Sequence, residues 1–244
     1  MKIKLVCALT FVVVLFFATN TFGGDFASLS FIGFSSNGKY LAFEEYGIQD
    51  ASGYPYSNIY YIDATKNAYA ATVTKVLIEN ESGLESTARA KAAVLAAKKL
   101  KQLGIVKGNT GKLLLSHLMT DQTYDDGSTS SEGDKVKFFE EVWSMHREGD
   151  YELELKAIKI ETPECKPYEM DTFRMELKLT DKVADTSKFL QKDTTLPAGR
   201  GCALSYRIQD VYLYKGVLAV FMGVFTQGFE GPDMRFMAAT GKLK

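Results

Sequence analysis

The chain has 244 residues, of which 46% are hydrophobic and 24% charged. This is the composition of an ordinary globular domain and excludes collagen-like or low-complexity disordered chains. Basic residues number 29 against 30 acidic residues. The basic excess typical of nucleic-acid-binding proteins is missing, so we expect no nucleic-acid partner. The length favours a single domain.

The N-terminus has the order of a secretory signal peptide. A short basic stretch at 1–4 precedes an uncharged run at 5–18, and small residues follow up to Gly23. The run is shorter than the roughly 20 apolar residues of a membrane span. We therefore expect cleavage to remove residues 1–23 and leave a periplasmic or secreted protein without a stable membrane span. Cleavage after Gly24 and an uncleaved anchor are the alternatives.

The mature chain keeps two cysteines, Cys165 and Cys202. Disulfides form and persist in the compartments to which exported proteins are sent. We therefore expect a Cys165–Cys202 disulfide. The alternative is two free buried thiols, which are common in protein cores.

Short strands and turns are predicted over 31–80. Asn37 and Gly38 separate two apolar stretches, which is a strong hairpin signal because both residue types accept positive φ. Residues 31–63 resemble one blade of a Tol-type β-propeller, through FSSNGKYLAF at 34–43 and NIYYID at 58–63. A propeller needs at least four blades, and the sequence holds no second copy of the motif.

One long helix is predicted near 83–103. Ser82 and Glu85 fit a capping box, and Gly104 is a typical stop. Lysines cluster toward its C-terminal end. The helix therefore packs on a sheet through its apolar face, or binds an anionic surface or another protein. The residues that share the apolar face are Leu84, Ala88, Ala92, Leu95, Ala96 and Leu103.

The remainder of the chain is predicted to be β. Apolar and polar residues alternate over 173–180, which indicates a strand with one solvated face. The strand at 217–226 is apolar on both faces and should be central in its sheet. Residues 181–200 are predicted to be an irregular polar connection.

These elements predict a mainly β (α+β) fold with antiparallel sheets. The arrangement is sandwich-like, barrel-like or propeller-blade-like, with one long helix. We expect a single domain over 24–244. It comprises a blade-like β segment at 31–80, the helix at 83–103 and a second β segment at 112–240.

Most catalytic signatures are absent: there is no G-x-S-x-G, H-E-x-x-H, P-loop or G-x-G-x-x-G. Two lone histidines, His117 and His146, do not have the ligand spacing of a zinc site. The acidic loop at 121–134 is rich in the oxygen ligands that calcium prefers, but the order of its residues does not match an EF-hand. We therefore expect no metal or other cofactor. The acids of that loop are Asp121, Asp125, Asp126, Glu132 and Asp134.

Acids beside tyrosines at 44–56 raise the possibility of sugar chemistry. Glu44 and Glu45 are adjacent on a predicted strand, so their side chains point to opposite faces and cannot serve one site. Glu45 and Asp50 together can, because glycosidases need two carboxylates that flank the scissile bond.

Two sets of segments combine Gly and Pro bends with aromatic and acidic residues. They are FEEYG at 43–47, QD at 49–50 and GYPYSNIY at 53–60, and PAGRGC at 197–202, YRI at 206–208 and GFEGPDMRF at 228–236. They resemble the domain-of-unknown-function family 2259 of predicted secreted bacterial proteins. The resemblance implies export and one domain, and it supplies no activity or catalytic residues.

If these segments meet in the fold, they form a charged ligand-binding cluster on exposed loops. Its members are Glu45, Asp50, Glu230, Asp233 and Arg235. The leading hypothesis is a non-enzymatic periplasmic binding or interaction module whose partner is an envelope protein or a glycan. The alternative is a cell-envelope glycan-acting hydrolase that uses paired carboxylates. A third possibility is an assembly partner that uses the basic helix or an exposed strand edge.

Overall fold

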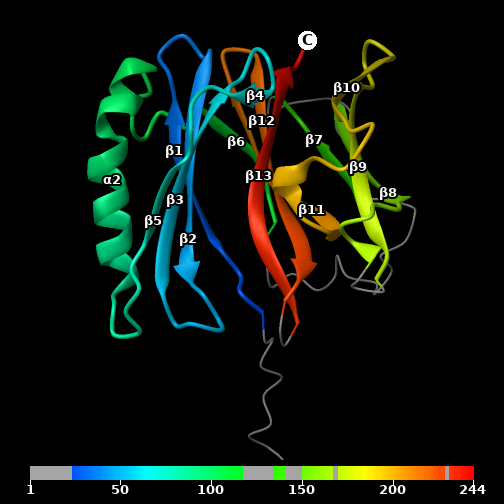
Figure 1. Ribbon diagram of the computed structural model, residues 1–244. Coiled ribbons are helices and arrows are strands. Elements are labelled where there is room, and N and C mark those ends of the chain that lie inside the picture. Colours follow the sequence, from blue (N-terminus) through cyan, green and yellow to red (C-terminus); the bar gives the residue numbers. More distant parts are fainter. Residues whose placement is uncertain (1–23, 118–133, 141–149, 167–169, 229–230) are drawn as a thin grey trace, which may run out of the picture.

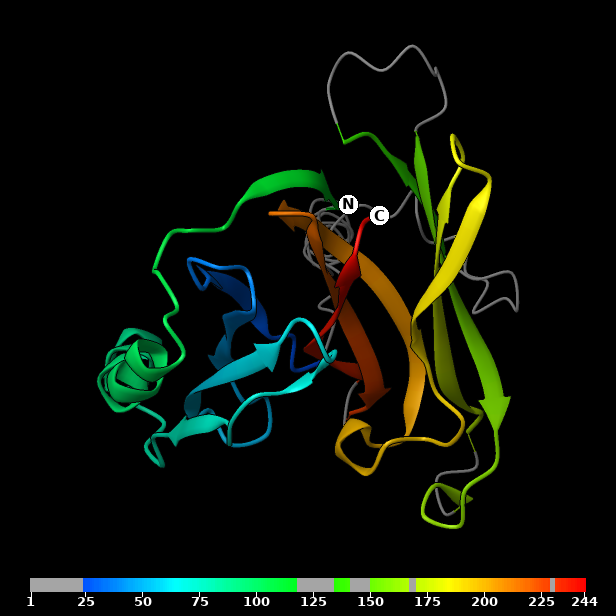
Figure 2. The same ribbon diagram turned by 90° about the horizontal axis from the view of Figure 1, so that it is seen from above.

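The computed structural model describes residues 24–117, 134–140, 150–166, 170–228 and 231–244. In these ranges the protein is mainly β, with three antiparallel sheets and a single α-helix (Figure 1). Seen from above, the helix and the three sheets form successive layers (Figure 2). The described strands form no closed barrel. The fold is therefore sandwich-like, as predicted.

The N-terminal sheet carries the helix on its outer face. Its order is β1-β2-β3-β4, and β5 also pairs with β3. The predicted hairpin is confirmed: Gly38 has φ +75°, and the Ser35 N–H donates to the Tyr40 carbonyl at 2.7 Å. The strands are β1 (Ser28–Phe34), β2 (Tyr40–Ile48), β3 (Pro55–Asp63), β4 (Ala68–Tyr69) and β5 (Thr74–Leu77).

Helix α2 (Glu85–Gln102) packs on this sheet mainly through alanines, and Leu100 near its C-terminal end is partly buried against the same core. Ala88, Ala92 and Ala96 are buried, and the sheet beneath presents Ile59 and Tyr61. The short alanine side chains let the helix backbone come close to these large sheet side chains.

Two expectations about α2 are wrong. Ala88, Ala92 and Ala96 are buried as expected, but Leu84 and Leu95 of the same predicted face are 66% and 64% exposed. The contact centres on the alanines, and the two leucines lie outside it. The capping box does not form either. Leu84 is the N-cap, and the Ser82 N–H donates to the Asn80 side chain at 3.0 Å. The stop at Gly104 is confirmed by its φ of +65°.

The central sheet is covered on both faces. Its order is β13-β12-β11-β6, so β12 is internal, as predicted. Leu218, Val220 and Met222 point to one core, whereas Ala219 and Phe221 point to the other. The strands are β6 (Lys112–Ser116), β11 (Ala203–Tyr214), β12 (Val217–Gln227) and β13 (Pro232–Lys242).

The outer sheet packs against the opposite face of the central sheet, in the order β10-β9-β8-β7. Its strands are β7 (Asp134–Phe138), β8 (Tyr151–Ile160), β9 (Thr172–Asp181) and β10 (Thr186–Lys192). The expectation of an irregular connection at 181–200 is wrong, because this segment contains β10 and the short helix η3 (Ala198–Arg200). Leu190 is the one buried residue of β10, so its sequence shows no alternation.

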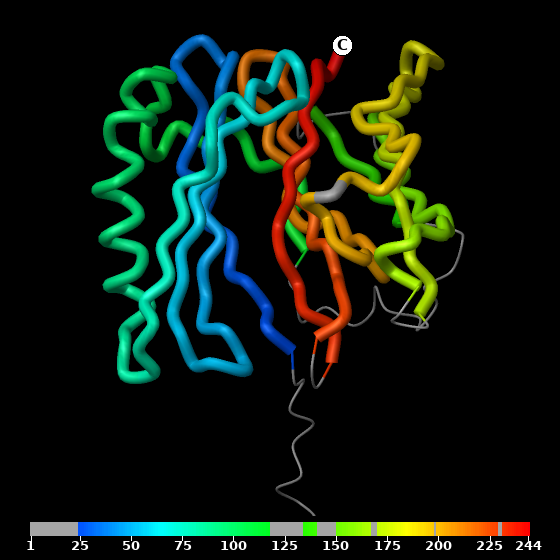
Figure 3. Tube along the Cα trace, viewed as in Figure 1, coloured from blue at the N-terminus to red at the C-terminus, as the bar shows by residue number. Residues whose placement is uncertain are grey.

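The chain visits the central sheet twice (Figure 3). It passes from the N-terminal sheet through α2 to β6, builds the outer sheet, and then returns as β11, β12 and β13. The N-terminal and C-terminal segments that the sequence singled out therefore meet where the N-terminal sheet faces the central sheet.

Candidate functional site

Glu45 lies within β2, with its carboxylate buried between the N-terminal and central sheets. Its Oε1 accepts hydrogen bonds from the Tyr60 hydroxyl at 2.6 Å and the Asn58 amide at 3.1 Å. Its Oε2 accepts the backbone N–H of Phe236, on β13, at 2.9 Å. Burial, and then the charge of Glu45, raise the pKa of Tyr60 well above its usual range. The Tyr60 hydroxyl therefore keeps its proton and donates to the carboxylate.

Arg235 forms the second half of the cluster. Its Nη2 lies 2.5 Å from Asp25 Oδ2, and its Nη1 donates to the carbonyls of Asp25 at 2.7 Å and Met234 at 2.9 Å. The guanidinium also lies 5.0 Å from the centre of the Tyr56 ring. Burial lowers the pKa of Arg235, but the hydrogen bond to Asp25 and the neighbouring charges outweigh it, so the net shift is upward. Arg235 is therefore held charged and paired.

Asp233 and its neighbour Met234 hold residues 25–27 against β13. Its Oδ1 accepts the backbone N–H of Asp25 at 2.9 Å, and the backbone of 25–27 pairs with Met234. Gly228 lies so close that an added Cβ would stand 2.4 Å from Asp233 Oδ1. A side chain at 228 would therefore displace the carboxylate.

The structure brings together three of the five predicted ligand-binding residues. Asp233 and Arg235 both bind Asp25, and Glu45 lies close enough for its charge to act on Arg235. Asp50 is exposed in the β2–β3 turn and joins none of these hydrogen bonds. Glu230 lies outside the described residues. The expectation that the cluster stands on loops is wrong for Glu45, Asp233 and Arg235, because Glu45 belongs to β2 and the other two to β13.

Sequence reasoning missed Asp25 and the pairing role of Tyr56. Asp25 is buried, and its carboxylate takes both the Arg235 ion pair and a long hydrogen bond of 3.4 Å from the Tyr56 hydroxyl. An isolated acid just after a predicted cleavage position gives no periodic signal. Its partners are about 30 and 210 residues away along the chain.

Glu44 serves the opposite face of the same strand. It receives two hydrogen bonds from Arg89 of α2, at 3.1 and 2.9 Å, and one from the Ser57 hydroxyl at 2.8 Å. The Arg89 guanidinium also stacks on the Tyr46 ring at 3.7 Å. The prediction that Glu44 and Glu45 point apart is confirmed, and each ties the N-terminal sheet to a different neighbour.

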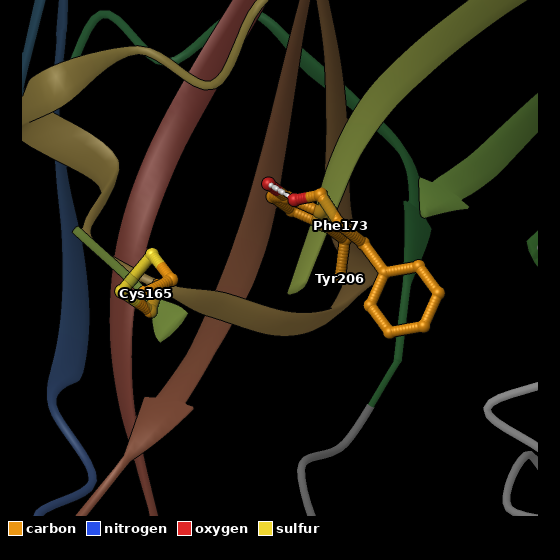
Figure 4. The surroundings of a disulfide bond; sticks show 4 residues. Cys165, Phe173 and Tyr206 are labelled. Carbon is orange, nitrogen blue, oxygen red and sulfur yellow. Dashed lines mark hydrogen bonds between the residues drawn. A yellow bond between two sulfur atoms is a disulfide. The ribbon is translucent and has the colours of Figure 1, made fainter. Parts of the chain in front are cut away.

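The disulfide expected between Cys165 and Cys202 is present, with an S–S distance of 2.05 Å and a Cα–Cα distance of 5.6 Å (Figure 4). It joins the segment after β8 to the residues just before β11. In its surroundings the Tyr206 hydroxyl donates to the Phe173 carbonyl at 2.8 Å. The disulfide therefore fastens the outer sheet to the central sheet.

A second buried ion pair lies near this disulfide. Arg200 of η3 binds the carboxylate of Asp193, whose side chain is almost completely buried. Gln191 and the backbone N–H of Met175 also donate to this carboxylate, at 2.5 and 3.3 Å. The sequence did not indicate this pair, because both residues fall within the segment predicted to be irregular.

Within the described ranges, no group of three or more His, Cys, Asp or Glu side chains is placed to hold a metal ion. His117 Nδ1 lies 3.1 Å from the Ile208 carbonyl oxygen. His146, Asp121, Asp125, Asp126 and Glu132 lie outside the described residues. Asp134 accepts the backbone N–H of Ile208 at 2.9 Å.

The family model of the Predicted secreted protein (DUF2259) matches residues 42–242. The chain belongs to this family. The family description confirms the resemblance predicted from the sequence and the expectation of an exported protein. Membership in DUF2259 assigns no activity, and the cleavage after Gly23 stays a prediction. No protein with a curated description matches the chain. In the described part of the chain, no helix has the length and apolar character to cross a membrane.

The carboxylates of the cluster are occupied by internal hydrogen bonds and an ion pair. A glycosidase needs two carboxylates that flank the scissile bond, one of which can exchange a proton with the substrate. Both oxygens of Glu45 are occupied by internal donors, and the Asp25 carboxylate is committed to Arg235. These contacts hold the N-terminal sheet against the central sheet.

Proposed function

We propose that this DUF2259 protein is a non-enzymatic interaction module of the compartment to which it is exported, and that it binds an anionic partner through helix α2. The observation that carries the proposal is the segregation of charge along the chain. Residues 86–120 contain seven basic residues and no acidic one, although the whole chain has a net charge of −1. Such segregation creates a local positive potential that attracts anionic partners.

The side of α2 away from the sheet presents much of this charge. Lys91, Lys98 and Lys101 are exposed, and no ion pair within the described residues involves them. Residues three, four and seven apart share one face of a helix. We call Lys91, Val94, Lys98 and Lys101 the outer face of α2.

Two other basic residues of the helix have internal roles. Arg89 pairs with Glu44 at 2.9 Å, and Lys99 Nζ donates to the Thr72 carbonyl at 2.6 Å. They hold α2 on the N-terminal sheet, so the outer face stands on a fixed support. A rigid support reduces the ordering cost of binding.

The glycan-hydrolase alternative gains no support from the geometry of Glu45. Glu45 is only 2% exposed, and Asp50 lies outside the cluster. The acids of this candidate site therefore account for stability, and the exposed lysines account for binding.

The test is retention on immobilised heparin, a soluble polyanion used as a probe. The variant K91E/K98E/K101E should elute at much lower salt than the parent. The control K66E/K166E/K188E makes the same change in net charge at exposed lysines away from α2. It should elute close to the parent. Equal loss in both variants, or no retention of the parent, would overturn the proposal.

A further inference from the structure

We infer that the anionic partner is the headgroup surface of an anionic phospholipid bilayer, on which the outer face of α2 lies flat. This inference rests on the proposed function and names its partner. Lys91 and Lys101 are ten residues apart, which separates them by about 15 Å along a helix axis. One small anion cannot contact both ends of such a row, whereas a planar array of phosphates can.

Exposed apolar side chains distinguish a bilayer from a soluble polyanion. Val94 is 76% exposed and stands between Lys91 and Lys98 on the outer face. Leu95, also largely exposed, borders that face on the flank. A soluble polyanion gains nothing from these side chains, but a bilayer accepts them at the boundary between headgroups and acyl chains.

The rest of the helix surface permits close approach. Ala90, Ala93 and Ala97 are exposed beside Val94, and their short side chains do not hold the backbone away from a flat surface. Lysine stems can lie along the apolar boundary while the ammonium groups reach the phosphates. Val94 and Leu95 can therefore insert without desolvating the charges.

The layered fold presents this helix to a surface. α2 forms the outermost layer on one side (Figure 2), and its axis runs alongside the N-terminal sheet (Figure 1). Outside residues 86–120, the chain has 22 basic and 30 acidic residues, because seven of the 29 basic residues lie in that segment. An anionic bilayer therefore attracts the helix side and repels the remainder.

Co-sedimentation with vesicles tests the inference on the mature protein. We use vesicles of phosphatidylcholine alone and of an equimolar mixture of phosphatidylcholine and phosphatidylglycerol. The parent should bind the mixed vesicles and not the neutral ones, and added salt should release it because screening shortens the range of the attraction. K91Q/K98Q/K101Q should weaken binding about a hundredfold, at about fivefold for each lysine.

The apolar side chains are tested separately from the charges. V94S/L95S should weaken binding to the mixed vesicles several-fold while retention on heparin stays unchanged. V183S is the matched control, because Val183 is an exposed valine in the turn between β9 and β10. It should bind vesicles like the parent. Circular dichroism checks that each variant is folded.

The outcomes separate the two claims. Retention on heparin without binding to mixed vesicles would overturn the bilayer inference and leave the proposed function standing. Vesicle binding by V94S/L95S equal to that of the parent would also overturn it, since the partner would then be recognised by charge alone. Failure of the parent to bind either probe would overturn both.

Discussion

Glu45 and Asp50 stand five residues apart on one strand and its turn, yet only Glu45 is integrated into the fold. The Glu45 carboxylate accepts three hydrogen bonds across two sheets, whereas Asp50 is exposed. Burial of a charge is favourable only when donors replace its lost water. The three donors around Glu45 provide that replacement.

Glu45→Gln should therefore lower the free energy of unfolding by about 1–3 kcal/mol, because one amide hydrogen would face a donor in the buried site. Asp50→Asn is the matched control and should change it by less than about 0.5 kcal/mol. Urea denaturation followed by fluorescence measures both. An E45Q protein as stable as the parent would contradict the structural role.

A pH prediction follows from Asp210 on β11. Burial raises the pKa of Asp210, while a hydrogen bond from Ser116 and the charge of His117 oppose the shift. A carboxyl group with a raised pKa binds its proton more tightly in the folded chain. Its ionisation therefore reduces stability above the folded pKa and has no such effect below the unfolded value.

Asp210→Asn should therefore be more stable than the parent at pH 7, and this gain should shrink toward zero near pH 3. Urea denaturation at the two pH values gives the comparison. A gain of the same size at both would mean that the substitution acts through packing rather than through ionisation.

The candidate site was predictable only where its residues carry a local signal. Glu45 and Arg235 belong to segments with unusual bends and aromatics, and the structure brings them together. Asp25 and the Asp193–Arg200 pair carry no such signal, because their partners are set by how the sheets stack. Residue type and spacing along one chain do not encode that stacking.

At the scale of elements, helix α2 shows which part of a packed face periodicity can predict. Periodicity placed Ala88, Ala92 and Ala96 correctly on the buried face, but it also placed Leu84 and Leu95 there, and both are exposed. By contrast β12 was predicted as central, because a strand with two buried faces must be apolar throughout. The continuous apolar run at 217–226 therefore predicts the central position of β12 without knowledge of its neighbours.

Ala92→Leu should lower the free energy of unfolding by about 1–3 kcal/mol, because Ala92 is fully buried between α2 and β3 and extra methyl groups overpack the contact. Ala93→Leu adds the same atoms at an exposed position of the same helix turn and should stay within about 0.5 kcal/mol of the parent. Thermal unfolding by circular dichroism compares them, and equal effects would contradict the packing assigned to α2.

At the scale of the whole molecule, Asn67 joins all three sheets. It lies in the turn between β3 and β4, and its amide donates to the Leu190 carbonyl at 3.0 Å and to Gln191 at 2.6 Å, both on β10. Its carbonyl oxygen accepts the backbone N–H of Thr240, on β13, at 2.8 Å. Small sheets with separate cores are thus fixed in one relative position.

Asn67→Gly keeps the positive φ of 50° accessible and removes these hydrogen bonds. It should lower the free energy of unfolding by about 2–3 kcal/mol, since the N–H of buried Thr240 loses its acceptor. Asp185→Gly is the control: Asp185 has the same φ of 50° in an exposed turn, so its effect should stay below about 1 kcal/mol. Urea denaturation distinguishes them, and similar losses in both would assign the effect to the turn.

The two-sided burial of β12 also sets the order in which the molecule can assemble. An exported chain crosses its membrane as an extended polymer, and residues 28–77 arrive long before residues 203–242. Until β12 and β13 are in place, Phe34 and Phe43 of the N-terminal sheet have no layer to pack against. The N-terminal and outer sheets can therefore bury their inner faces only after the last sixth of the chain is available. During translocation the early segments therefore expose apolar side chains, and they avoid aggregation only if chaperones cover them or if the rest of the chain follows rapidly.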